Sequence, residues 1–490
     1  MATWRGASSD STAQQAAAST PTHPSGAERR LGTTEVAFCT TEVAFCTTEV
    51  AFWQDDYRRR LWITQKALWS ITQNKTLAGC HRWRAPGARD ASLRWRGEGT
   101  ARWASLQDSH SVWGSPVSAA AIQGLRAAET TTAIQNWTEK PGHSVQFLTL
   151  TLRHRKSQGL TELWDALSYC WQSVIGTSAW KGGIRQLGDK AEFSISHFIK
   201  SVEVTVGKNG WHVHMHALLL TERRLSELEL AKLRGKIFAR WSRAAERKGL
   251  DAPSDEHGAD LRQAGTGQDA EDVAGYVAKG MSQSLGAEVS GGLGKIARKG
   301  SRTPFQILED IGLDQQRGEE PEAEDVALWL TWERESKGSR QMTWSKGAKD
   351  ALGIADLTDE ELVEAGEAAV ESWTIAKVEP DEWRKVQSKV DVRLEVVEAV
   401  SAAESVEEAV KIGHEVLVKL GIGHQVCMVS DQEVEDRCEG REVVKERSVR
   451  AKLGREEAWR EGLRRALDLG KVKKPVPVSA EPAFVQSVLF

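Results

Sequence analysis

The chain has 490 residues, of which 40% are hydrophobic and 27% are charged, and this composition is typical of a globular protein with one large core or two to three smaller ones. No stretch approaches the roughly 18 to 20 uninterrupted apolar residues of a membrane helix, and residues 1–25 lack the apolar segment of a signal peptide. The six cysteines include no CxxC pair, so reduced thiols are expected. We therefore expect a cytoplasmic protein without a membrane partner.

The net charge of −4 hides an uneven distribution of charged residues. Residues 51–250 carry 30 lysines and arginines against 16 aspartates and glutamates, whereas residues 301–450 carry 19 against 35. A basic region can bind a phosphate backbone. Ordinary solvated helix surfaces explain the same asymmetry equally well.

The N-terminal part of the chain is compositionally biased. Residues 1–32 are rich in Ala, Ser and Thr without periodicity, which predicts disorder. Near-identical heptads follow at 33–39, 40–46 and 47–53, with the sequences TTEVAFC, TTEVAFC and TTEVAFW. Units this short do not build a solenoid, so a duplicated coding segment is favoured over an interaction segment. We assign 1–56 as a disordered segment and 57–135 as an N-terminal region.

Hydrophobic periodicity then predicts a mixed series of strands and helices. Residues 143–154 read as a buried strand, and 160–175, 225–245 and 269–286 as amphipathic helices. A helix also ends near residue 134, and another, followed by a short Trp-bearing segment, falls within 323–352. The order of strand, helix, hairpin and two helices between residues 143 and 281 predicts an α+β sandwich with a mainly antiparallel sheet.

A predicted hairpin gathers histidines on one face. Residues 198–206 and 211–220 alternate with period two and flank the sequence GKNG, a strong hairpin signal. His212, His214 and His216 alternate with apolar residues, so their imidazoles share one face. With either possible two-residue loop, Glu203 lies on that face, opposite His214 or His216.

These residues can bind a metal and support phosphodiester chemistry. Imidazoles with a carboxylate make a site for Mn²⁺ or Mg²⁺ with open positions for a substrate oxygen. On the predicted helix 269–286, Asp272, Tyr276 and Lys279 share a face, and a tyrosine near a lysine and a metal can act as a nucleophile. Two plainer interpretations stay open: a structural or unrelated His-x-His metal pair, and a capping role for Asp272.

Three segments carry a family resemblance. FLTLTLRH (147–154), EVTVGKNGWHVHMHALLL (203–220) and VAGYVAKG (273–280) resemble, in order and character, the three motifs of rolling-circle plasmid replication initiator (Rep) proteins. These belong to the HUH endonuclease superfamily, and the greatest similarity is to initiators of actinobacterial plasmids. The resemblance extends from about residue 61 through the WSKG sequence at 344–347.

The resemblance implies a role for each site residue. His214 and His216 would be the paired metal ligands, Glu203 a third ligand or a polar group that orients them, and His212 a neighbour or extra ligand. The catalytic residues would be Tyr276 as the single nucleophile, Lys279 as its partner and Asp272 as a carboxylate that activates water to finish replication.

The chain departs from the family at a cysteine cluster. Relatives carry cysteines where this sequence has Ser109, Ser115 and Ser118, while Cys80 is retained. Because serine hydroxyls do not replace thiolates as zinc ligands, we expect no structural zinc, and the fold of residues 61–122 is left open.

We therefore expect an initiator that nicks and rejoins one strand of plasmid origin DNA through a metal-dependent phosphotyrosine intermediate. It would have a nicking domain of the HUH sandwich fold at 136–310, an accessory helical segment at 311–380 and an acidic, mostly helical region at 381–490. Host helicase and polymerase would be further partners. The alternatives are a DNA-binding protein that has lost replication activity, and a single-tyrosine HUH transposase or relaxase.

Overall fold

Two antiparallel sheets and their covering helices make up the described part of the chain. A computed structural model describes residues 47–96, 100–184, 186–264, 301–368 and 371–430, all of which belong to one unit, residues 45–490. The predicted helix at 269–286 lies outside these residues. Among those described, no helix combines the length and apolar character needed to cross a membrane.

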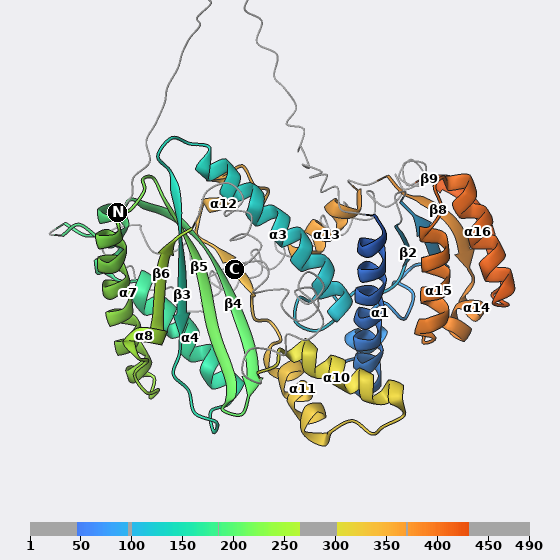
Figure 1. Cartoon of the computed structure of the whole chain (residues 1–490), viewed down its shortest axis with the longest axis horizontal. Coiled ribbons are helices and arrows are strands. Elements are labelled where there is room, and N and C mark those ends of the chain that lie inside the picture. Colours follow the sequence, from blue (N-terminus) through green and yellow to red (C-terminus); the bar gives the residue numbers. More distant parts are fainter. Residues whose placement is uncertain (1–46, 97–99, 185, 265–300, 369–370, 431–490) are drawn as a thin grey trace, which may run out of the picture. The chain divides into compact units, whose positions relative to one another are not determined.

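The larger sheet has five antiparallel strands in the order β6-β3-β5-β4-β7 (Figure 1). The strands are β3 Ser144–Thr151, β4 Ile195–Gly207, β5 Gly210–Thr221, β6 Ala259–Gln263 and β7 Met342–Trp344. This arrangement confirms the predicted α+β class and the hairpin.

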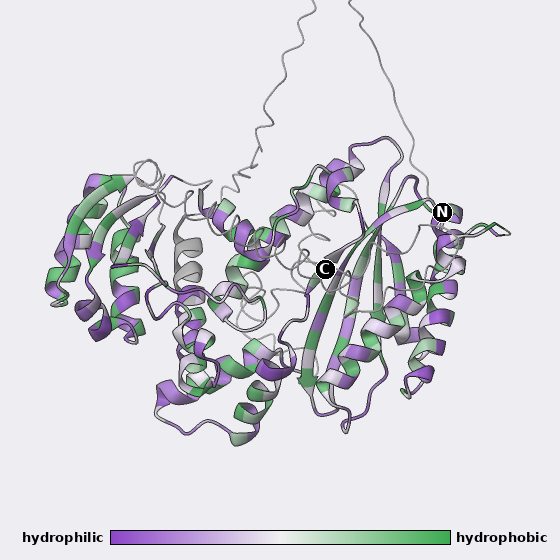
Figure 2. Ribbon diagram, turned by 180° about the vertical axis from the view of Figure 1, so that it is seen from behind, coloured by the Kyte–Doolittle hydropathy of each residue, from purple (hydrophilic) through white to green (hydrophobic). Residues whose placement is uncertain are grey.

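Alternation along the strands sends apolar side chains to both faces of this sheet. Val213 and Met215 join the larger core with α4 (Leu160–Ile175) and α7 (Glu227–Arg247). On the opposite face, Ile199 and Leu218 pack with residues of α3 (Pro116–Thr138). Green, apolar residues accordingly run along these strands in Figure 2.

Several helices begin where the sequence predicts. The segment 160–175 is α4, as expected. The basic helix expected at 225–245 is α7; it starts at Glu227 because Ser226 and Glu229 form a capping box that satisfies backbone N–H groups of the first turn. The helix and Trp-bearing segment expected within 323–352 are α11 (Ala323–Glu335) and β7.

The smaller sheet was not anticipated from the sequence. Its order is β2-β1-β8-β9, with the bounds β1 Ala91–Trp95, β2 Ala101–Ala104, β8 Trp373–Val378 and β9 Gln425–Ser430. It packs with α15 (Val390–Ser401) and α16 (Val406–Lys419), and α14 (Pro380–Val386) precedes them. The region 381–490, predicted to be mostly helical, thus contributes a strand in addition to these helices. Strand β1, from the assigned region 57–135, pairs with β8, from the assigned region 311–380.

The N-terminal helix starts earlier than expected. α1 spans Thr47–Ile71, so residues 47–56 are helical although we assigned them to a disordered segment. This stretch contains no glycine or proline, the residues that most disfavour a helix interior. Residues 61–122, left open above, form α1, α2 (Lys75–Gly79), β1, β2 and the start of α3.

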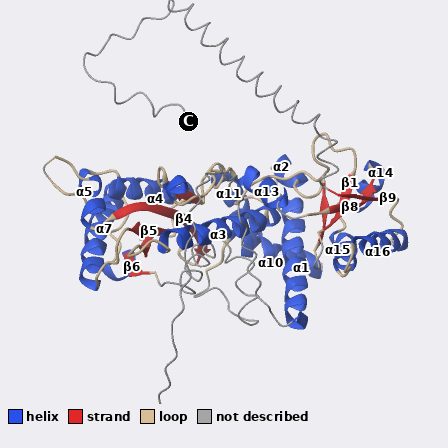
Figure 3. Ribbon diagram, turned by 90° about the horizontal axis from the view of Figure 1, so that it is seen from above, coloured by secondary structure: helices blue, strands red, loops and turns tan. Residues whose placement is uncertain are grey.

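Most of the remaining helices are short, whereas α10 (Pro304–Arg317) packs into the larger core. Figure 3 separates the helices, in blue, from the strands of the two sheets, in red. They are α5 Ser178–Lys181, α6 Asp189–Glu192, α8 Asp255–Gly258, α10 Pro304–Arg317, α12 Ala348–Ala351 and α13 Asp359–Ala368.

Candidate metal centre

The β4–β5 hairpin sets the geometry of the histidine face. Its turn consists of Lys208 and Asn209, and the register places Glu203 opposite His214, as predicted. Gly210 closes the turn with φ 84°, a left-handed conformation that glycine adopts at no steric cost. The turn therefore fixes the positions of the histidines along β5.

A carboxylate and two imidazoles meet on this face. Glu203 Oε2 lies 3.0 Å from His214 Nε2 and 3.3 Å from His216 Nε2. Glu203 and His214 are 13% and 14% exposed, and His216 is 4% exposed. The cluster is thus largely shielded while two of its members keep some access to solvent.

The spacing of these donor atoms fits coordination of one ion. Two ligand atoms that bind an ion at about 2.1 Å and at right angles are about 3.0 Å apart. Nitrogen and carboxylate oxygen donors with open positions suit divalent ions such as Mn²⁺. Glu203, His214 and His216 together are therefore a candidate divalent-metal group.

Neighbouring residues hold His216 in place. Its Nδ1 lies 3.0 Å from Thr149 Oγ1 on β3, and the ring of Phe147 stacks on it with a centroid distance of 5.3 Å. When Nδ1 carries the proton and donates to Thr149, the lone pair of Nε2 is free for a metal. Thr149 could thus hold the ring in the ligating tautomer when an ion replaces the hydrogen bond between His216 and Glu203.

The local electrostatics favour the metal-binding protonation states. Burial would raise the pKa of Glu203, but hydrogen bonds from His214 and His216 outweigh it and lower that pKa to about 2. Burial lowers the pKa of His216. An anionic carboxylate and a neutral imidazole are the forms that bind cations.

His212 lies beside this cluster and pairs with a residue that the sequence analysis gave no role. Its Nδ1 is 3.0 Å from His154 Nε2, and its ring centroid is 5.1 Å from that of His214. Burial, with the nearby His214 and His154, lowers the pKa of His212 to about 4. The sequence feature that could have pointed to His154 was its position at the end of the predicted strand 143–154.

The predicted catalytic residues Asp272, Tyr276 and Lys279 lie outside the described residues, in 265–300. Both ends of that segment are held by the five-stranded sheet. Ala264 donates its N–H to the carbonyl of Val145 at 2.9 Å, and Arg302 exchanges two backbone hydrogen bonds of 2.8 Å with Val206.

The other two tyrosines lie away from the cluster. Tyr169, on α4, is flanked by the cations of Arg247 and Lys248, and α4 packs on the sheet face opposite to the histidines. Tyr57 packs into the larger core from α1.

The zinc site that the family resemblance implies can be tested against Cys80 and its surroundings. Cys80, His81 and Asp108 offer donor atoms within 4.8 Å of one another. The hydroxyl of Ser118 lies among them, 3.4 Å from Cys80 Sγ and 3.1 Å from His81 Nε2, and donates to Asp108 at 2.5 Å. Cys80 is the one thiol among these residues, so a thiolate-rich zinc set does not fit them, while Cys80, His81 and Asp108 stay a group that could hold an ion.

Comparisons with known proteins give two similar chains, both from Streptomyces. A Streptomyces lividans protein named Protein rep is 30% identical over 288 residues, covering 50% of this chain and 63% of that protein. The neomycin resistance protein of Streptomyces cyanogenus is 30% identical over 132 residues, covering 23% of this chain and 30% of that protein.

This chain therefore spans less than two thirds of the length of either relative. No protein-family model matches it, and no solved structure matches it. The comparisons indicate a similarity to a Rep-type protein over half of the chain.

Proposed function

We propose that this protein is a plasmid rolling-circle replication initiator that nicks and rejoins one strand of its origin. The observation that carries the proposal is the contact of one Glu203 oxygen with His214 and His216 at 3.0 and 3.3 Å. The similarity to Protein rep and the order of the three motifs support it. The antiparallel sheet supports the HUH endonuclease fold for residues 136–310, which supply four of its five strands. The fifth strand, β7, comes from the segment 311–380.

Each site residue takes the role given by its chemistry. Glu203, His214 and His216 would hold Mn²⁺ or Mg²⁺, with His212 as a neighbour or extra ligand. When bound, the ion would polarise the phosphoryl oxygens of the scissile phosphate.

Tyr276 would perform the nucleophilic step. Its phenolic oxygen attacks the phosphorus, a phosphotyrosine bond to the 5′ end forms, and the bond to the 3′ oxygen breaks and leaves a 3′ hydroxyl. Lys279 would stabilise the phenolate of Tyr276. Asp272 would activate water to finish replication, and a second transfer would rejoin the displaced strand.

The positions of the two residues that flank 265–300, Ala264 and Arg302, support this assignment. Tyr276 is the twelfth residue after Ala264, and a chain of that length spans up to about 40 Å. The segment returns at Val206, three residues along β4 from Glu203. Tyr276 is therefore within reach of the cluster. The other two tyrosines, Tyr57 and Tyr169, lie away from it.

A nicking assay tests the proposal. Supercoiled plasmid that carries the origin should be converted to the open circular form by the parent with Mn²⁺ present. Tyr276→Phe and His214→Ala should abolish the conversion. Tyr169→Phe, which removes a hydroxyl on the other face of the sheet, is the matched control and should nick like the parent.

The outcomes separate the alternatives. A parent that binds origin DNA without nicking it would be the DNA-binding protein that has lost replication activity. Nicking that persists in Tyr276→Phe would show that another group is the nucleophile. Cleavage of a transposon end in preference to a plasmid origin would favour the transposase or relaxase.

A further inference from the structure

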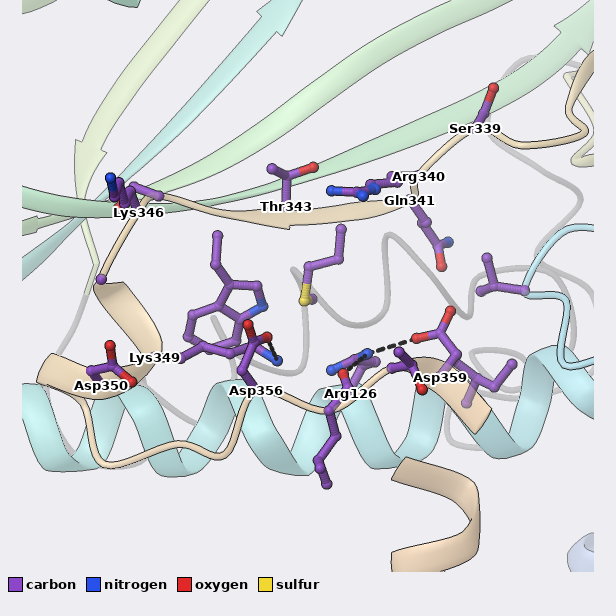
Figure 4. A pocket seen from close by; sticks show the side chains of 18 residues that line it. Arg126, Ser339, Arg340, Gln341, Thr343, Lys346, Lys349, Asp350, Asp356 and Asp359 are labelled. Carbon is purple, nitrogen blue, oxygen red and sulfur yellow. Dashed lines mark hydrogen bonds and ion pairs between the residues drawn. The ribbon is translucent and has the colours of Figure 1, made fainter. Parts of the chain in front are cut away.

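A cavity of about 660 Å³ lies between the β7 strand and helix α3. The segment 339–347 forms one wall, α3 contributes Ile122 and Arg126, and residues 356–359 close another side (Figure 4). Its volume falls within the range of about 300 to 1,000 Å³ that is typical of small-molecule sites.

Gln341 is a buried amide on the wall of this cavity. It is 5% exposed, and its Oε1 has no hydrogen-bond partner among the described residues. Its backbone carbonyl is already used by the N–H of Val202 at 2.9 Å. In Figure 4 the side chain points from the 339–347 segment toward α3. Because a buried polar atom without a partner is costly, the amide is suited to a ligand that supplies one.

Two cations flank Gln341 along the same segment. Arg340 and Lys346 are exposed and line the cavity, and within the described ranges no ion-pair partner is found for either. Phosphate groups are the natural ligands of such side chains.

Two further cations that line the cavity, Arg126 and Lys349, already have acidic partners, and these ion pairs hold the cavity wall in place. Arg126 binds Asp359 at 2.7 Å and the carbonyl of Leu357 at 2.9 Å. Lys349 binds Glu129 at 3.0 Å and lies 5.5 Å from the centre of the Trp344 ring. The residues that shape the site are therefore fixed before any ligand binds.

The cavity shares a sheet face with the metal cluster. Met342, which lines it, lies opposite Ser201 on β4, and Ser201 lies opposite His216 on β5. Directly opposite side chains in an antiparallel pair point to the same face. Glu203 is two residues, about 7 Å, from Ser201 along β4. A single strand bound at the cluster could therefore reach the cavity.

We propose that this cavity binds one unstacked nucleotide of the single strand that leads to the metal cluster. A glutamine amide offers both a donor and an acceptor to a base edge, Trp344 offers an aromatic face for stacking, and Arg340 and Lys346 bind the flanking phosphates. The inference rests on the proposed function for the identity of the strand. Gln341 would contribute to base preference.

Binding of single-stranded DNA tests the subsite without any cleavage. Fluorescein-labelled dT, dA and dC oligomers of about 20 nucleotides exceed the usual single-strand site sizes of about 4 to 16, and their anisotropy is measured with the full-length protein in EDTA. Gln341→Leu should weaken binding of the preferred oligomer about tenfold. The same substitution should leave the midpoint of thermal unfolding unchanged or raise it, because it removes an unpartnered polar atom.

A charge-matched pair of double variants tests the phosphate contacts. The affinity falls as the salt concentration rises. The double variant Arg340→Ala, Lys346→Ala should reduce the steepness of this fall, plotted as log affinity against log salt, by about 1.4, since each phosphate contact to a single strand contributes about 0.7. Lys181→Ala with Lys411→Ala removes two exposed charges outside the cavity lining and should leave the slope at its parental value.

Photo-cross-linking then locates the strand. An oligomer containing 5-iododeoxyuridine should cross-link to the tryptic peptide that contains Met342 and Trp344. Cavity variants that bind like the parent, or cross-links confined to other peptides, would overturn the subsite even if nicking occurs. Failure of the parent to nick, with the binding and cross-linking pattern intact, would overturn the initiator proposal and leave the subsite standing.

Discussion

Replacing Glu203 by glutamine keeps the size of the side chain and removes the charge that the two histidines share. A carboxylate and a divalent ion about 2.1 Å apart attract each other by about 4 kcal/mol even at the dielectric constant of water. The amide oxygen remains a neutral ligand, so we expect about half of this, roughly 2 kcal/mol, to be lost. Mn²⁺ affinity should fall about 30-fold.

Calorimetric titration with Mn²⁺ measures this change directly. Glu335→Gln is the matched control, because Glu335 accepts hydrogen bonds from Thr161 on α4, on the far side of the sheet from the cluster. The affinity of Glu335→Gln for Mn²⁺ should equal that of the parent. If Glu203→Gln also bound Mn²⁺ with parental affinity, Glu203 would not be a ligand, and the account of the cluster would have to be abandoned.

Three further predictions concern the surroundings of the site. Thr149→Val removes the partner of His216 Nδ1 and should weaken Mn²⁺ binding between about 10- and 100-fold; an unchanged titration would exclude this orienting role. Elemental analysis of the parent should find no stoichiometric zinc, whereas Ser118→Cys should bind zinc. Zinc in the parent would contradict the assignment of Cys80, His81, Asp108 and Ser118 as a hydrogen-bonded group without an ion. Gly210→Ala should lower the free energy of unfolding, measured by urea titration, by about 1 to 2 kcal/mol. Residue 210 has a positive φ, and the added Cβ would lie 3.1 Å from the backbone of Lys156. Gly235→Ala, on open helix surface, should raise the free energy of unfolding in the same titration.

The candidate metal-binding cluster of Glu203, His214 and His216 was the part of the molecule most accessible from the sequence. A period of two and a GKNG turn are local signals, and together they fix which side chains of β4 and β5 face each other. Those signals place Glu203 opposite His214 or His216, and the structure has it opposite His214. The orienting contact of Thr149 does not, because β3 joins β5 through a long connection whose register no local signal sets.

Features that depend on distant pairing were missed. Leu93 pairs with Ala376 in the smaller sheet, and neither segment has a turn that points to the other. The unpartnered amide of Gln341 was equally invisible, since a glutamine in a short polar segment is exposed in most proteins. This segment is joined to β4 by the hydrogen bond from the N–H of Val202 to the carbonyl of Gln341, a pairing that no local signal sets.

The central claim is that Tyr276 becomes covalently joined to the nicked strand. Mass spectrometry of the protein digested after reaction with origin DNA and Mn²⁺ would identify the modified peptide. We expect a nucleotide on Tyr276, attached through a 5′ phosphate, that is absent from His214→Ala. Attachment at Tyr57 or Tyr169, or a nick without any covalent adduct, would contradict it.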